Sequence, residues 1–177
     1  METKEEEMEQ GVTHIRPGDG RSLRALDEVV TYKITSERTG GAYSLFEVVS
    51  EPGGGPPPHV QHREDEAFYV LEGEYEFLDN DGHTMRVGKG SLVYVPKGNL
   101  HTYKNVGTTP GKMLVSQTPG GLHERFFEEI GQEAQDKFKP MAHEGLLDTE
   151  RIVALAAMYG IEIPPPTPGW YTDGKAT

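Results

Sequence analysis

The chain has 177 residues, which is enough for one domain with a sizeable hydrophobic core. Its formal net charge of −12 at pH 7 argues against nucleic acids and membranes as partners, because both of these anionic surfaces bind a basic protein face. The chain contains no cysteine, which excludes disulfides, thiolate catalysis and cysteine-based zinc sites.

The first twenty residues predict an acidic, disordered tail (residues 1–20). Its beginning is rich in glutamate, at Glu2, Glu5, Glu6, Glu7 and Glu9. This is the opposite of a secretory signal peptide, which begins with positive charge and continues with an apolar stretch. The longest nearly apolar run of the chain, Ile152 to Ile161, is too short to cross a bilayer. We therefore expect a soluble, cytoplasmic protein.

Short segments with strand propensity alternate with turn signals through residues 21–120. The abundance of Gly (22) and Pro (13) is typical of all-β chains with many tight turns. Asp81-Gly82 favours a β-hairpin, because the primed turns need positive φ angles there. The predicted strands are Ser22–Leu26, Val29–Thr35, Ala42–Ser50, Glu66–Glu72, Glu74–Leu78, Thr84–Val87, Ser91–Val95, His101–Val106 and Lys112–Gln117. Short strands at this spacing indicate a closed barrel or a sandwich.

The last third of the chain, residues 121–177, predicts a helical extension followed by a Pro-rich tail. Leu122, Phe126 and Ile130 are four residues apart, which places them on one face of a helix. Asp148 is a favourable N-cap for a second helix that stops at Gly160. That helix is expected to bury Ile152, Leu155, Ala156 and Tyr159.

Four side chains in the predicted barrel can bind a metal ion: His59, Gln61, Glu66 and His101. His59 and Gln61 are two residues apart, so on a strand their side chains share a face. Two imidazoles, a carboxylate and an amide oxygen suit a first-row divalent cation, with nickel, iron, manganese, cobalt and zinc all open. The alternative is that His59 and His101 are only hydrogen-bonded barrel residues.

The spacing of these residues resembles that of the cupin superfamily, and of its single-barrel (cupin type-2) members in particular. The first cupin motif, G-x5-H-x-H-x3,4-E-x6-G, is matched at Gly53, His59, Glu66 and Gly73, with Gln61 in place of the second histidine. The second motif, G-x5-P-x-G-x2-H-x3-N, is matched at Gly90, Pro96, Gly98, His101 and Asn105. The resemblance implies an all-β, double-stranded β-helix (jelly-roll) barrel with C-terminal helices.

A second resemblance concerns the segment after the barrel. Pro119-Gly120-Gly121 followed by Glu124-Arg125-Phe126-Phe127-Glu128 is similar to the corresponding segment of bacterial quercetin 2,3-dioxygenase-like cupins. In that subgroup a metal-bound glutamate is the base that deprotonates the flavonol, and the resemblance gives this catalytic role to Glu66. It implies a metal-dependent dioxygenase for a flavonol-like or other enolisable aromatic substrate. A non-catalytic barrel that binds a small molecule or metal, and an isomerase, remain the alternatives.

Gln61 is the one departure from the two motifs. Its side chain could bind the metal through the amide oxygen, could support another ligand, or could mark a site that has lost its metal. His62 could replace it, although strand alternation points His62 to the other side of the sheet. The segment His62–Asp65 is expected to be a charged, solvated turn, and His14, His83, His123 and His143 are expected to lie on the surface.

Aromatic and thioether side chains predict an apolar pocket inside the barrel, large enough for a flat organic molecule. The candidates are Phe46, Phe68, Phe77, Tyr94, Tyr103 and Met113. Ordinary barrel core is the alternative interpretation for most of them. We also expect a homodimer, because a barrel edge would otherwise be left unpaired. Val29–Thr35 and the C-terminal helix, with Ile152, Leu155 and Tyr159, are the expected contacts.

Overall fold

Two antiparallel sheets face each other in the computed structural model, which describes residues 11–137 and 148–165. The beginning of the predicted acidic tail, most of the Pro-rich tail and His143 lie outside the described residues. The strands are β1 Ser22–Ala25, β2 Glu28–Ile34, β3 Ser44–Ser50, β4 His59–Gln61, β5 Asp65–Glu72, β6 Glu74–Leu78, β7 Thr84–Gly88, β8 Leu92–Val95, β9 Leu100–Asn105, β10 Gly111–Thr118, β11 Gln132–Glu133 and β12 Ile161–Glu162. The helices are α1 Leu122–Ile130 and α2 Thr149–Met158.

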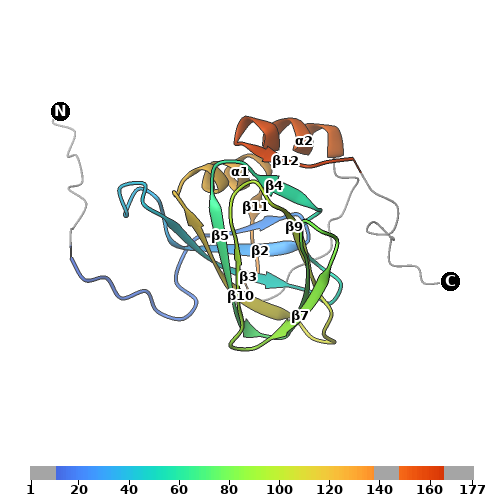
Figure 1. Cartoon of the computed structure of the whole chain (residues 1–177). Coiled ribbons are helices and arrows are strands. Elements are labelled where there is room, and N and C mark those ends of the chain that lie inside the picture. The colour runs from blue at the N-terminus through green and yellow to red at the C-terminus, as the bar shows by residue number, and fades with distance from the viewer. Residues whose placement is uncertain (1–10, 138–147, 166–177) are drawn as a thin grey trace.

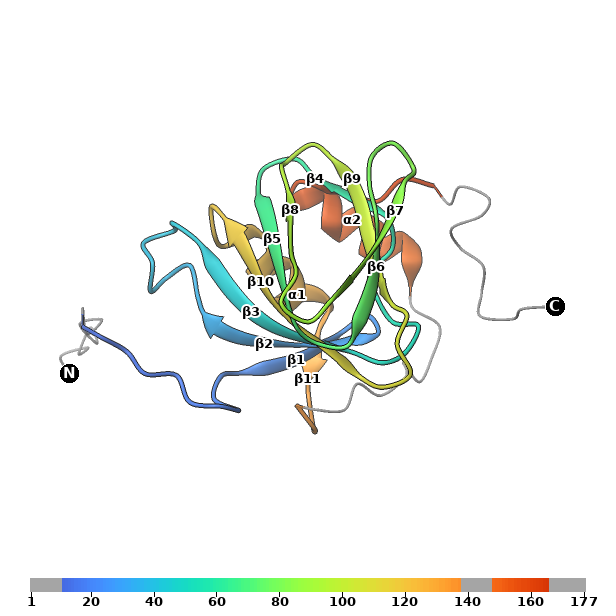
Figure 2. The same ribbon diagram turned by 60° about the horizontal axis from the view of Figure 1, so that its bottom comes forward.

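The larger sheet has the strand order β11-β1-β2-β3-β10-β5-β8, and the smaller has the order β12-β4-β9-β6-β7. Every strand pair in both sheets is antiparallel. The sheets curve around a common interior, and both helices lie at one end of the barrel (Figures 1 and 2). The predicted jelly-roll barrel with C-terminal helices is therefore confirmed.

All nine predicted strands are present, with ends that differ by at most two residues. The three strands without a prediction, β4, β11 and β12, have two or three residues each. Such short strands carry no usable period, and β11 and β12 exist because distant parts of the chain pair with β1 and β4. The strand that carries His59 and Gln61 is one of these.

The hydrophobic core fills the space between the two sheets. Strand alternation directs Tyr75 and Phe77 of β6 inward, and both are buried, whereas Glu74 is exposed. Phe68 packs edge-on against Phe77 and Tyr103, with ring centroids 5.3 and 5.5 Å away. This network of rings fixes the inner faces of β5, β6 and β9, and β5 and β9 carry Glu66 and His101.

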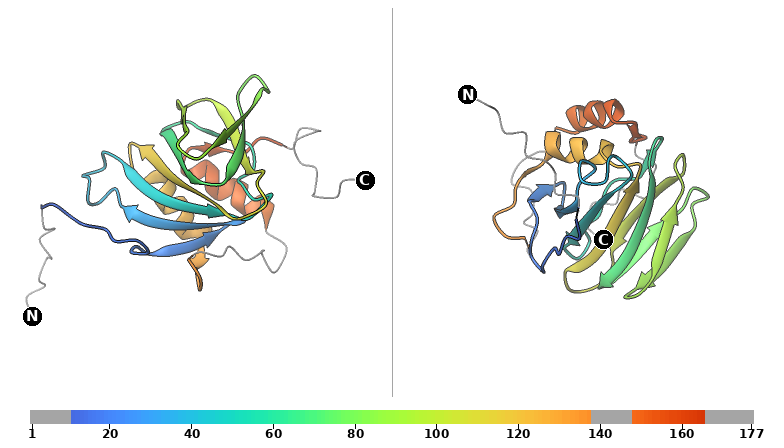
Figure 3. Two further views of the ribbon diagram at one scale, coloured as in Figure 1. Left: turned by 90° about the horizontal axis from the view of Figure 1, so that it is seen from below. Right: turned by 90° about the vertical axis from the view of Figure 1, so that its left-hand side faces the viewer.

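The two helices pack against each other and close one end of the barrel (Figure 3). Asp148 caps α2 as predicted, because its side chain accepts a hydrogen bond of 3.0 Å from the backbone N–H of Arg151. Ala156 is fully buried, and Ile152, Leu155 and Tyr159 pack beside it against Phe126 of α1. The apolar face of α2 is thus covered by its own chain. No described helix is long and apolar enough to span a membrane.

The segment Val29–Thr35, one of the expected contacts between two chains, is not an edge strand. This segment is β2, and it pairs on one side with β1 and on the other with β3. It is therefore an interior strand whose backbone groups are already hydrogen-bonded. The edge strands of the larger sheet are β8 and β11. Association of two chains remains an expectation, with its surface still to be identified.

Candidate metal centre

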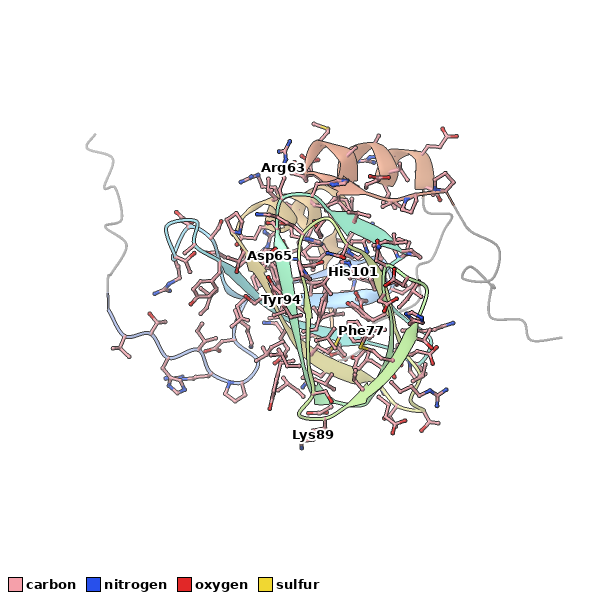
Figure 4. All side chains as sticks on the ribbon, in the orientation of Figure 1. Arg63, Asp65, Phe77, Lys89, Tyr94 and His101 are labelled. Atoms are coloured by element: carbon pink, nitrogen blue, oxygen red, sulfur yellow. The ribbon has the colours of Figure 1, made fainter. Side chains whose placement is uncertain are left out.

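His59, Glu66 and His101 meet inside the barrel, where their ligand atoms all lie within 4.8 Å of one another. His59 and His101 are directly opposite each other on β4 and β9. Glu66 comes from β5 in the other sheet, so the group joins both layers of the barrel. Figure 4 places His101 between Arg63 near α2 and Lys89 at the far end. Glu66 Oε2 is 2.8 Å from His101 Nε2 and 3.9 Å from His59 Nε2.

Backbone carbonyls orient both imidazoles. His59 Nδ1 donates to the carbonyl oxygen of Pro57 at 2.9 Å, and His101 Nδ1 donates to that of Asn99 at 3.1 Å. A carbonyl can only accept, so these bonds place the ring protons on Nδ1 and leave Nε2 as a lone pair facing Glu66. This is the tautomer in which histidine binds a metal through Nε2.

The group leaves buried atoms that a cation would satisfy. Gln117 Nε2 donates to Glu66 Oε1 at 3.1 Å, which holds the carboxylate in place. Glu66 Oε2 and His101 Nε2 are 2.8 Å apart, and neither atom has another hydrogen-bond partner among the described residues. Two nitrogen lone pairs and a carboxylate oxygen that converge in a buried space fit a first-row divalent ion.

The charge states of these groups also suit a metal. Burial lowers the pKa of His59 to about 3, with a further contribution from the neighbouring His101, so His59 is neutral. Burial raises the pKa of Glu66, but the His101 imidazole beside it outweighs this and brings the pKa down to about 2. Burial lowers the pKa of His101, whereas the adjacent Glu66 carboxylate raises it, and the net direction is upward. A metal bound at His101 Nε2 would replace the proton that this nitrogen gains when His101 is protonated.

Gln61 follows His59 on the same face of β4, and its side chain is hydrogen-bonded to His123. Its side chain is 2 % exposed, and its Nε2 is 2.6 Å from His123 Nδ1. His62, the alternative ligand, is exposed and pairs with Glu162 at 2.8 Å, as strand alternation predicted. Gln61 therefore faces the barrel interior together with His59, and His62 faces away.

Two side chains that we expected at the surface are buried. His123 is only 7 % exposed, and Glu64 is 0 % exposed. Glu64 accepts hydrogen bonds from the backbone N–H groups of Leu122 and His123 at 3.0 and 3.4 Å, so the supposed solvated turn anchors the start of α1. The sequence offered one signal for His123, because it shares a helix face with Phe126 and Phe127.

Gln117 is a further site residue that the sequence analysis missed. It is 1 % exposed and is directly opposite Glu66 across the β10–β5 pair. Met113, Val115 and Gln117 alternate along β10 and are all buried. A polar residue that continues an inward-facing apolar series is the signal that could have identified it.

Two of the three candidate ligands, His59 and Glu66, line a cavity of about 50 Å³, which is room for roughly three to five water molecules. Phe46, Phe68 and Tyr103 line it as predicted, whereas Phe77 and Met113 lie in the surrounding core. Tyr94 is 59 % exposed, so its predicted place in the pocket is wrong. The reason is the alternation of β8, in which Val93 faces inward and both of its neighbours face outward.

Comparison with known proteins assigns the barrel to a family. A family model described as a cupin domain matches residues 46–116. The uncharacterized protein MJ1618 of Methanocaldococcus jannaschii is 30% identical over 106 residues, which cover 60% of this chain and 79% of that protein. A germin-like protein of Arabidopsis thaliana (subfamily 2, member 2) is 39% identical over 84 residues. That match covers 44% of this chain but only 38% of the germin-like protein, well under half of its length.

The solved structures agree on the fold. A predicted oxalate decarboxylase from Thermotoga maritima superposes with a TM-score of 0.57 and 21% identity. The superposition covers 60% of this chain and 99% of that protein. At this identity the likeness establishes the double-stranded β-helix and leaves the substrate open.

Proposed function

Because the chain belongs to the cupin family, we propose that it binds one divalent first-row transition metal at His59, Glu66 and His101. We propose further that it acts as a dioxygenase on a small, enolisable and largely apolar substrate. The observation that supports this most directly is the convergence of the three ligand atoms beside a cavity with mainly apolar walls, which His59 and Glu66 line. Such a site combines a chelating centre with a binding surface for a carbon skeleton.

The wall of the cavity limits the substrate class. Among the described residues that line it, none is Lys or Arg. A sugar phosphate or a dicarboxylate would therefore meet no positive side chain other than a bound metal, which disfavours an isomerase of sugar phosphates. Phe46, Phe68 and Phe127 instead offer ring surfaces. The volume favours a compound with one ring over a three-ring flavonol.

Each polar residue has a role in this proposal. His59 and His101 hold the metal through Nε2. Glu66 would be the base that receives the proton of the substrate hydroxyl, with Gln117 holding its carboxylate in place. A bound metal would supply Lewis-acid polarisation of the substrate oxygen. The apolar wall excludes water from the deprotonated substrate.

Oxygen consumption tests the proposal. The full chain, reconstituted separately with Mn, Fe, Co, Ni and Zn, is offered single-ring catechols, 1,3-diketones, quercetin and oxalate. We expect turnover of single-ring or diketone compounds. Glu66→Gln should lose this turnover, whereas the exposed control His14→Ala should keep it. Turnover of oxalate alone, or consumption equal in the parent and Glu66→Gln, would contradict the proposal.

A non-catalytic binding barrel is the second candidate. It is favoured by Gln61, since an amide is a weaker ligand than the imidazole of the cupin motif and an enzyme needs a resident metal. A compound that shifts the melting temperature of the metal-loaded chain, with no oxygen uptake under any of the five metals, would identify this function.

A further inference from the structure

We infer that His123 is a positioning residue for Gln61, and that the pair supplies the fourth metal ligand of this barrel as an amide oxygen. His123 holds Gln61 Nε2, so that Gln61 Oε1 is the branch of the amide left for the metal. The inference rests on the metal site proposed above. It gives a function to the one position where the chain departs from the cupin motif.

The geometry begins with Gln61. It follows His59 on the same face of β4, and its backbone is fixed by pairing with Ile161 of β12. A side-chain amide carries a donor and an acceptor on opposite branches. The 2.6 Å contact engages Nε2 with His123 Nδ1, which leaves Oε1 as the free branch. This arrangement requires the His123 tautomer with its proton on Nε2.

His123 is itself held firmly. Its ring lies 4.7 Å from the ring of Phe127 and 5.8 Å from that of Phe126, and it lines the same cavity as His59 and Glu66. The backbone N–H of His123, in the first turn of α1, donates to the buried carboxylate of Glu64. A negative charge is favourable at this end of a helix. An acceptor fixed in this way orients Gln61 without reaching the metal itself.

The pair changes which metal the site prefers. An amide oxygen is a harder ligand than an imidazole nitrogen, so exchanging one for the other favours Mn²⁺ relative to Zn²⁺. The contact between Gln61 and His123 also predicts that Gln61→His alone would not restore the three-histidine metal site. An imidazole at position 61 would compete with His123 for the same small space, and the compensating change is His123→Gln.

Metal titration of the chelator-stripped full chain tests the inference, with Mn²⁺ and Zn²⁺ competed against a chromophoric chelator. Gln61→Ala should weaken Mn²⁺ binding roughly 10- to 100-fold, as is typical when support of a metal ligand is lost. His123→Phe keeps the ring and removes the acceptor, and it should weaken binding to a similar extent. The double variant should bind no more weakly than Gln61→Ala, because His123 acts through Gln61. The exposed control His62→Phe should match the parent.

Two further variants separate the possible outcomes. The exchange Gln61→His with His123→Gln should raise Zn²⁺ affinity relative to Mn²⁺ at least about tenfold. His123→Gln alone retains an acceptor and should bind Mn²⁺ better than His123→Phe, which covers the case in which His123→Phe is poorly folded. Parental binding by His123→Phe, or single losses that multiply in the double variant, would overturn the inference. If His101→Ala also bound metal like the parent, the metal centre itself would be wrong, which is a separate failure.

Discussion

Replacing Glu28 with glutamine should flatten the pH dependence of stability between mildly acidic and mildly alkaline conditions. Glu28 lies on the interior strand β2, is 6 % exposed and lines the cavity. It accepts a hydrogen bond of 2.5 Å from Ser50 Oγ, and the Tyr103 hydroxyl donates one bifurcated hydrogen bond to its two carboxylate oxygens, both 2.9 Å away. Burial nevertheless dominates and raises its pKa from 4.5 to about 7.

The sign follows from proton binding. Between these two pKa values the folded chain keeps a proton on Glu28 that the unfolded chain has lost, so stability falls as the pH rises. Each unit of pH in this window costs about 1.4 kcal/mol. The contribution of Glu28 is therefore fully favourable below pH 4.5, and from about pH 5 to about pH 8 the chain loses about 2.5 kcal/mol. Glutamine does not titrate and keeps a comparable shape.

Urea unfolding at several pH values measures this difference. The chain should be stripped of metal and kept in chelator, so that metal binding adds no pH dependence of its own. The free energy of unfolding of Glu28→Gln, relative to the parent, should rise by about 2.5 kcal/mol from about pH 5 to about pH 8. Glu37→Gln, in an exposed turn, should follow the parent. Parallel curves for the parent and Glu28→Gln would refute the reasoning.

Three further outcomes are expected. His101→Ala should lose the bound divalent ion, measured by elemental analysis of protein purified without chelating resin, whereas the exposed His14→Ala should keep it; equal metal content would contradict the assignment. Phe46→Ala removes a fully buried ring and should lower the free energy of unfolding by about 3–5 kcal/mol, and a loss under about 1 kcal/mol would show that the barrel collapses around the gap. Light scattering should give twice the 19.6 kDa mass, and Tyr94→Lys on the edge strand β8 should reduce it; a monomer throughout the micromolar range would rule out the dimer.

Local patterns were sufficient for most of the barrel. The alternation in β6 and the hairpin between β6 and β7 depend on neighbouring residues only, and both were predicted from the sequence. The turn itself is not of the primed type that was predicted, because Gly82 has a positive φ angle and Asp81 does not. The spacing of the two motifs also indicated that His59, Glu66 and His101 would meet, and the structure brings their ligand atoms together. These residues are close because the strands that carry them are neighbours or face each other across the barrel.

The remaining features depend on contacts between distant segments. Leu92, Val93, Tyr94 and Val95 are all apolar, so the sequence of β8 does not show which face points inward, and Tyr94 was placed wrongly. Glu64 and His123 are polar residues in charged segments, so the sequence predicted that both lie on the surface. Their burial follows from the docking of α1 onto the loop after β4, which no period in the sequence reports.

The pairing of β12 with β4 brings Ile161, which follows the second helix, into the interior wall of the barrel. The region that matches the cupin family stops at residue 116, yet Gln117, His123 and Ile161 all line the cavity. Substitutions in the extension can therefore reshape the cavity while every motif position stays unchanged. Relatives that share the motifs can therefore differ in the substrates that they bind. A barrel cut at residue 120 would lack His123 and Ile161 of the cavity wall, and we expect its substrate selectivity to change.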